Sequence, residues 1–327
     1  MSSHHYNIRA DELIKTVRDL SNTISDRREF HSKAKPILKK MADSDFIAVI
    51  FERNLRDQAY LTRSWTTYEI PFLYIDETNH FNTKFHVFPP IKSRDSEKAA
   101  NIIHHHNNYL LTSFTVQGPG YHTMHFEKDI VELDKDEVRL KISKDFFHHK
   151  LNFSFVDSYE PHIVFNMEEL TTTLVLWSPD QKHLTDGLRN NPIIKPFKKS
   201  IIALINALGL NRALGVSEAK VYQWFVQNGK CYRILEEDYF GIYRALKGPE
   251  IDLIFTQAVA LFVQRSGYNN QSFIKEMLDT RGTPEHWKKW LKYLEVRQKI
   301  PEVFGKEYIN VPDKKILRED IREACTE

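Results

Sequence analysis

The sequence of 327 residues has few of the residues that mark several common classes of protein. Its 2 cysteines, Cys231 and Cys325, exclude a disulfide framework and a cysteine-based zinc module, and they suit a reducing compartment. Its 11 glycines form neither a P-loop nor a glycine-rich dinucleotide fingerprint. Lys and Arg number 46 against 44 Asp and Glu, so the net charge of +2 is too balanced for a chain devoted to nucleic acid.

Long apolar segments are lacking as well. No run approaches the roughly 18 apolar residues that span a bilayer, and the start, MSSHHYNIRADELIK, has no apolar signal-peptide core. We therefore expect a soluble, cytoplasmic protein without a membrane partner. Hydrophobic residues at 41% and charged residues at 28% match ordinary globular usage, which excludes a disordered chain or a coiled coil.

Hydrophobic periodicity divides the chain into three parts. Residues 1–57 have the spacing of an N-terminal helical segment. Residues 58–180 contain short runs rich in β-branched and aromatic residues, the first at 60–70, separated by Asp, Asn, Gly and Pro. Helical spacing returns over 187–327, where the polar tail is expected to dock loosely. The sequence therefore predicts an α+β fold: an antiparallel β-barrel flanked by N-terminal helices and a C-terminal helical domain.

Histidine is concentrated in the predicted barrel, where eleven of the 15 lie between His80 and His183. In NIIHHHNNYLLTSFTVQ, His104 and His106 share one face of a strand, about 7 Å apart at Cα, while His105 faces the other way. Two imidazoles at this spacing suit neighbouring positions on one metal ion.

The same alternation continued along the strand predicts its inner wall. Asn108, Leu110 and Phe114 share the face of His104, and this set is the more apolar, so we expect it to line a dry substrate pocket. Tyr109 falls on the opposite face, where it is a sheet aromatic or a catalytic phenol. Gly118 and Gly120 flank a proline and predict a turn that ends the strand.

A second motif follows about 56 residues later in SYEPHIVFNMEEL. His162 and Asn166 lie on one face of a strand, so His162 can supply a third imidazole if the two strands are neighbours. Asn166 is a candidate to bind substrate, to orient His162 or to close a turn. His122 and His125 are candidates for an acid–base group or a partner of a metal ligand, and His122 is the one we assign.

His-x-His, then eleven residues, then Gly118, resembles the first motif of the cupin superfamily, and His162-x3-Asn166 resembles the end of the second. The resemblance covers roughly residues 85–178. It departs from the family where a glycine is replaced by Lys98, and where the carboxylate expected after His-x-His is replaced by Leu110 or Leu111.

The resemblance implies a metal site formed by His104, His106 and His162. Three neutral imidazoles leave a divalent ion with its full charge and open positions, which suits direct binding of an anionic substrate, as in three-histidine cupin dioxygenases. We therefore expect a mononuclear non-haem oxygenase that uses O2 on a small polar or anionic molecule. Fe(II) is favoured, although imidazole suits Ni, Mn, Zn and Cu as well.

Two other functions remain open. LNRALGVSEAKVYQWF has the spacing of a helix-turn-helix, and a second candidate follows at 264–290, so the chain could be a cupin-type sensor with a DNA-binding domain. Against this, residues 187–327 carry 23 Lys and Arg and 17 Asp and Glu, a small excess. A metal-dependent isomerase or decarboxylase fits the same barrel, and the C-terminal helices could cover its mouth or join two chains in a homodimer.

Overall fold

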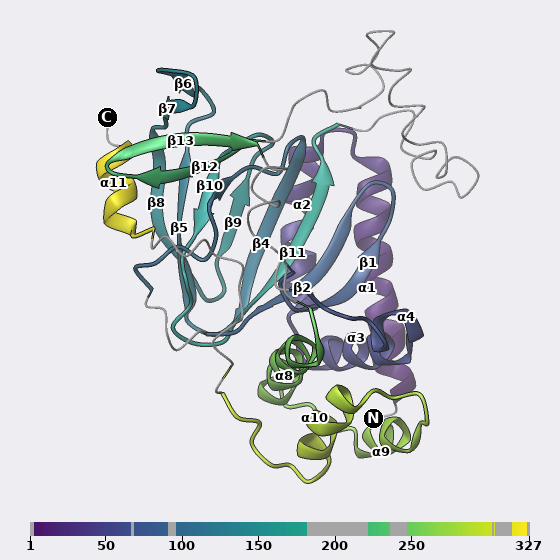
Figure 1. Cartoon of the computed structure of the whole chain (residues 1–327). Coiled ribbons are helices and arrows are strands. Elements are labelled where there is room, and N and C mark those ends of the chain that lie inside the picture. Colours follow the sequence, from purple (N-terminus) through teal and green to yellow (C-terminus); the bar gives the residue numbers. More distant parts are fainter. Residues whose placement is uncertain are drawn as a thin grey trace, which may run out of the picture.

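The computed structural model describes residues 3–66, 69–90, 96–181, 222–235, 247–302, 304 and 316–325 (Figure 1). Two antiparallel sheets face each other as a curled half-barrel, with helices packed outside it. One sheet has the order β1-β2-β11-β4-β9, and the other has the order β6-β7-β13-β12-β3-β10-β5-β8. The expected cupin-like barrel with flanking helices is therefore confirmed by the strand order itself.

The five-stranded sheet consists of β1 (Phe72–Glu77), β2 (Asn82–Phe88), β4 (Tyr109–Gln117), β9 (Phe153–Val156) and β11 (Thr171–Pro179). The eight-stranded sheet consists of β3 (Ile103–His104), β5 (Gly120–Phe126), β6 (Val131–Glu132), β7 (Glu137–Arg139), β8 (Ile142–His149), β10 (His162–Val164), β12 (Tyr222–Gln227) and β13 (Lys230–Leu235).

Both faces of the five-stranded sheet are covered. Its outer face packs on helices α2 (Arg27–Met41) and α3 (Ser44–Arg56), and on α8 (Pro249–Arg265) at one end, where a large apolar core includes Phe85, Phe114 and Leu174. Helix α1 (Ser3–Thr23) packs on α2 and α3. Helices α9 (Gln271–Asp279) and α10 (Glu285–Glu295) pack on each other and, through α10, on α8. Asn270 caps α9, where its side chain accepts a hydrogen bond from the backbone of Phe273.

The predicted strand at 60–70 is wrong. Its start forms the short helix α4 (Gln58–Leu61), because the Asp57 side chain accepts a hydrogen bond from the Ala59 amide and caps a new turn. Tyr60 and Trp65 are then buried in the helical core rather than in a sheet.

The expected second helix of the helix-turn-helix is also wrong over 222–229. These residues begin a hairpin in which β12 pairs with β13 across Asn228 and Gly229, both at positive φ (53° and 67°). Asn-Gly is the dipeptide that favours a two-residue hairpin turn, and this local preference decides the structure. The hairpin joins the barrel through β3, so the part at 187–327 is not purely helical. The stretch before residue 222 lies outside the described residues.

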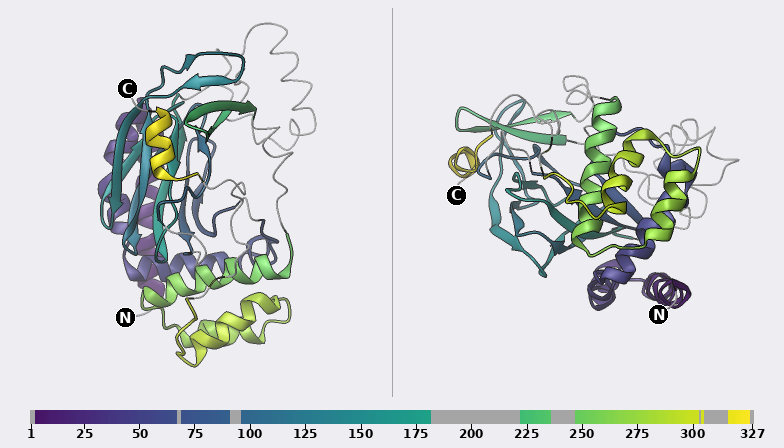
Figure 2. Two further views of the ribbon diagram at one scale, coloured as in Figure 1. Left: turned by 60° about the vertical axis from the view of Figure 1, so that its left-hand side comes forward. Right: turned by 90° about the horizontal axis from the view of Figure 1, so that it is seen from below.

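The described end of the C-terminal tail, residues 316–325, packs more closely than expected. Helix α11 (Arg318–Cys325) lies beside β12 and β13 (Figure 2). Its Ile321 and Cys325 are buried in the apolar cluster of the eight-stranded sheet. Within the described ranges, no helix is both long and apolar enough to cross a membrane.

Candidate metal centre

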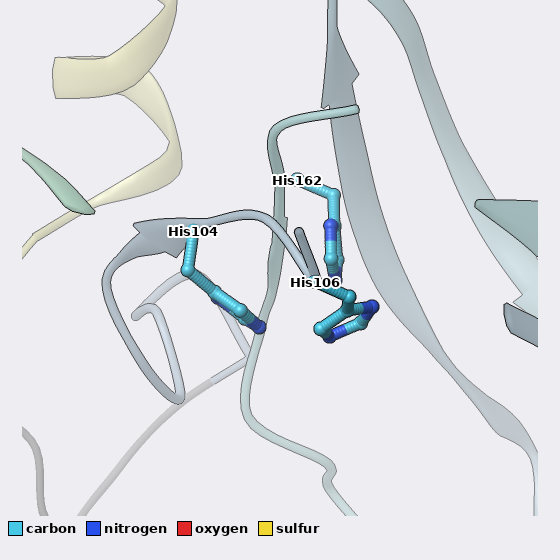
Figure 3. Close-up of side chains that lie close together, drawn as sticks. All are labelled: His104, His106 and His162. Atoms are coloured by element: carbon cyan, nitrogen blue, oxygen red, sulfur yellow. The ribbon is translucent and has the colours of Figure 1, made fainter. Parts of the chain in front are cut away.

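The three histidines of the two motifs meet inside the half-barrel (Figure 3). One ring nitrogen from each of His104, His106 and His162 lies within 4.8 Å of those of the other two. The arrangement follows from strand pairing, because β10 lies beside β3 with His162 directly opposite His104. His105 faces away, as expected, and its ring lies 5.5 Å from that of Trp224.

Backbone carbonyls orient two of the three rings. Nδ1 of His104 lies 3.0 Å from the carbonyl oxygen of Ile102, and Nδ1 of His162 lies 3.2 Å from that of Glu160. A carbonyl can only accept, so each Nδ1 carries the proton and each Nε2 keeps its lone pair for a ligand. Nδ1 of His106 is buried without a hydrogen-bond partner among the described residues.

Burial keeps the three rings neutral. Desolvation lowers the pKa of His104 and lowers the pKa values of His106 and His162 well below the ordinary value, and the neighbouring imidazoles lower the latter two further. Neutral imidazole is the form that binds a metal ion. The residues therefore fit a divalent cation, because three ring nitrogens with free lone pairs converge. In addition, the buried Nδ1 of His106 lacks the hydrogen-bond partner that a buried polar atom normally has.

The triad forms part of the wall of a cavity of about 310 Å³ between the two sheets. Side chains that alternate along β11 line it, namely Thr173, Val175 and Trp177. The Trp177 ring lies 4.2 Å from that of His106. The volume is that of a site for a small organic molecule.

Strand β4 presents the face opposite to the one predicted. Leu111 and Ser113 line the cavity, whereas Leu110 and Phe114 are fully buried on the outer face, where Phe114 stacks on Phe153 at 4.5 Å. The reason is Asn107, whose positive φ of 53° turns the chain between β3 and β4, so that side-chain alternation restarts at Tyr109. The assignment of Leu110 and Phe114 to the substrate pocket is therefore wrong.

The same turn also directs Asn108 and Tyr109, the candidates for substrate binding and catalysis, away from the cavity. In the described structure neither Asn108 nor Tyr109 lines the cavity; the carbonyl of Asn108 accepts a hydrogen bond from the backbone of Asp180 at 2.7 Å. The catalytic assignment of Tyr109 therefore has no geometric basis.

His122 is not among the described residues that line the cavity. Its Nε2 bonds Asp145, and its Nδ1 accepts from Arg318 of α11 at 2.9 Å, so both ring nitrogens are occupied. These bonds fasten the C-terminal helix to β5 and β8. We replace its proposed acid–base role with this structural one.

Asn166 is the substrate-binding candidate that the structure places in the cavity wall. It is 3% exposed, and neither atom of its side-chain amide has a hydrogen-bond partner among the described residues. His125 lines the cavity too, with Nδ1 3.0 Å from the carboxylate of Glu160.

Sequence reasoning missed Gln223 of β12. This residue lies opposite His104 across the strand pair and lines the cavity, with its Oε1 buried and unpartnered in the described structure. It falls in a stretch with apparent helical spacing, and the signal that could have revealed it is the Asn228-Gly229 turn.

Comparison with known proteins gives structural neighbours only. No family model and no curated protein matches the chain. The chain is similar to the cupin domain of Cnp3 from Schizosaccharomyces pombe (12% identity over 34% of this chain and 59% of that one, TM-score 0.22). It is also similar to an uncharacterised protein with a double-stranded β-helix domain from Klebsiella pneumoniae (12%, 34% and 78%, TM-score 0.23).

A third similar structure is hydroquinone 1,2-dioxygenase from Sphingomonas sp. TTNP3, at 5% identity over 38% of this chain and 71% of that one, with a TM-score of 0.24. At this level of similarity the chemistry of the neighbours does not transfer to this chain. The cupin-like fold rests on the strand order, and the metal centre rests on its three histidines.

Proposed function

We propose that the protein is a mononuclear non-haem metal-dependent oxygenase, with Fe(II) as the favoured ion, acting on a small molecule in the half-barrel. The observation that carries the proposal is the convergence of three neutral imidazoles, one buried and two half-buried, on the wall of a cavity large enough for an organic ligand. His104, His106 and His162 would hold the ion from one side and leave positions free on the other. A redox-active ion bound there would supply the electrons that make O2 reactive.

The chain itself binds and shields the reactants in this proposal. Val164 and Val175 exclude water from the cavity, and Trp177 covers the ring of His106. The carbonyls of Ile102 and Glu160 fix the orientation of two ligand rings before any ion arrives. Fixed rings lose little freedom on binding, which favours affinity.

Elemental analysis of the purified full-length chain tests the first half of the proposal, and we expect about one equivalent of a transition metal. O2 consumption after anaerobic loading with Fe(II), with a panel of chelating carboxylates and phenols, tests the second half. Turnover of a panel member in the absence of O2 would instead identify the isomerase or decarboxylase. A chain that binds no metal would contradict the oxygenase, the isomerase and the decarboxylase alike.

A further inference from the structure

The cavity extends well beyond the triad along one wall. His162, Val164 and Asn166 alternate along the same face of the chain, and all three line the cavity. The backbone stays paired over this length: the Ala100 amide bonds the Val164 carbonyl at 2.8 Å, and the Asn166 amide bonds the Lys98 carbonyl at 3.0 Å. Four residues of extended chain separate the Cα atoms of His162 and Asn166 by about 13 Å.

The middle of this wall is apolar. Val164 of β10, with Ala100 and Ile102 of the segment before β3, separates the histidines from Asn166. The polar residues beside them, Asn101 and Thr123, already bond the backbone of Val164 and Ile163. A ligand that reaches both ends therefore needs an apolar body.

The far end offers a neutral amide. Asn166 can donate two hydrogen bonds and accept two, and none of these is satisfied by the described residues although the side chain is 97% buried (3% exposed). Native proteins rarely leave such a group without a partner, so a ligand group is the missing complement.

The charged residues of the cavity wall limit which ligand group can bind at the Asn166 end. Among the described residues no Lys or Arg lines the cavity, and the carboxylate that does, Glu69, pairs with Arg63. A second anionic group at the far end would find no cation among these described residues to compensate for its lost hydration.

We propose that the cavity takes an elongated ligand with a metal-chelating head, an apolar body and an uncharged hydrogen-bonding tail, such as a carboxamide, that Asn166 recognises. The inference rests on the proposed metal centre at the head end. It makes Asn166 a specificity-determining residue rather than a turn-closing one.

Three para-substituted benzohydroxamates test the proposal. All share the same chelating head and ring, and they differ in a carboxamide, carboxylate or methyl group at the far end. Calorimetric titration of the zinc-loaded full-length chain should give the tightest binding for the carboxamide, about tenfold tighter than the methyl compound. The carboxylate should bind at least tenfold more weakly than the carboxamide.

Variants assign this preference to one residue. Asn166→Leu keeps the branched shape without the polar atoms and should bring the carboxamide and methyl affinities within about twofold of each other, whereas Asn166→Asp should weaken binding of the carboxylate further. Asn152→Leu, the same substitution at an exposed position, should leave all three affinities unchanged.

The outcomes separate the two proposals. Equal affinities for the three probes on a metal-loaded wild-type chain would overturn the tail recognition and leave the metal centre standing. A wild-type chain that holds no zinc and binds no hydroxamate would overturn both. The order of the three probe affinities on the wild-type chain tests the proposal by itself, so the test remains valid even if a variant misfolds.

Discussion

Two regions bury histidines in opposite ways. At the interface between α2 and the five-stranded sheet, His31 bonds Thr112 through Nδ1 at 2.8 Å and Ser178 through Nε2 at 2.9 Å. In the barrel, the half-buried His106 has a buried Nδ1 without a partner among the described residues, and it lies beside two other rings. Both sites keep imidazole neutral by desolvation, so burial alone does not mark a functional histidine. The difference is whether the protein itself satisfies the ring nitrogens.

The largest expected effect is the loss of metal from the barrel site. His162→Ala removes the central ring, which lies 4.5 Å from that of His104 and 4.4 Å from that of His106. Metal affinity should fall by more than about 100-fold, beyond the effect of losing a residue that only orients a ligand. Titration with Zn²⁺ against a competing chelator measures this. Retention of wild-type affinity would show that the triad is structural, like His31.

The matched change at the other site should affect stability instead. His31→Leu removes the partner of the buried Thr112 hydroxyl and leaves that of Ser178 with the Pro179 carbonyl alone, and we expect a loss of about 2 kcal/mol in the free energy of unfolding. Denaturant unfolding of the metal-free chain measures the loss, and zinc affinity of the folded variant should stay at the wild-type level. A fall in zinc affinity as large as that of His162→Ala would erase the distinction.

The dependence of stability on pH sharpens the comparison further. Desolvation, with smaller contributions from Arg27 and Lys35, lowers the pKa of His31 to about 3 from 6.5. The unfolded chain then binds more protons at this site, so stability should fall as the pH drops from about 6.5 towards 3, by up to about 1.4 kcal/mol per pH unit.

Comparing metal-free wild type and His31→Leu isolates this contribution. Over the same pH interval, the free energy of unfolding of the variant should change less steeply with pH, by up to the equivalent of one bound proton. Parallel curves would mean that His31 is protonated in the folded protein.

The smallest effect is expected at the hairpin that carries Gln223 to the site. Asn228→Ala with Gly229→Ala forces two alanines into positive φ and should cost about 2 kcal/mol in stability. Because β12 pairs with β3 at His104, zinc affinity should also fall, by less than His162→Ala causes.

Gly267→Ala is the control for the hairpin. It too lies at positive φ, with open space around the added methyl group, but it follows α8 rather than the barrel. It should lower stability without changing zinc affinity. If both variants lost zinc affinity equally, the loss would follow from lower stability in general, and the hairpin would have no specific effect on the site.

Local patterns predicted the parts of the protein in which one preference dominates. His104, His106 and His162 lie in short β-rich runs, and the pairing of β10 with β3 brings them together. Local reasoning failed at 60–70 and 222–229, where a cap at Asp57 and a turn at Asn228 and Gly229 outweigh the apparent periodicity.

The sequence by itself determined the short strands, the concentration of histidine and the identity of the three converging rings. Only the tertiary structure decided which face of β4 looks into the cavity. Helices cover the outside of that sheet, so both faces are buried, and the more apolar one, with Leu110 and Phe114, packs outward. Hydrophobicity distinguishes buried from exposed faces, and it cannot distinguish a helix-packed face from a ligand-facing one when both are removed from water.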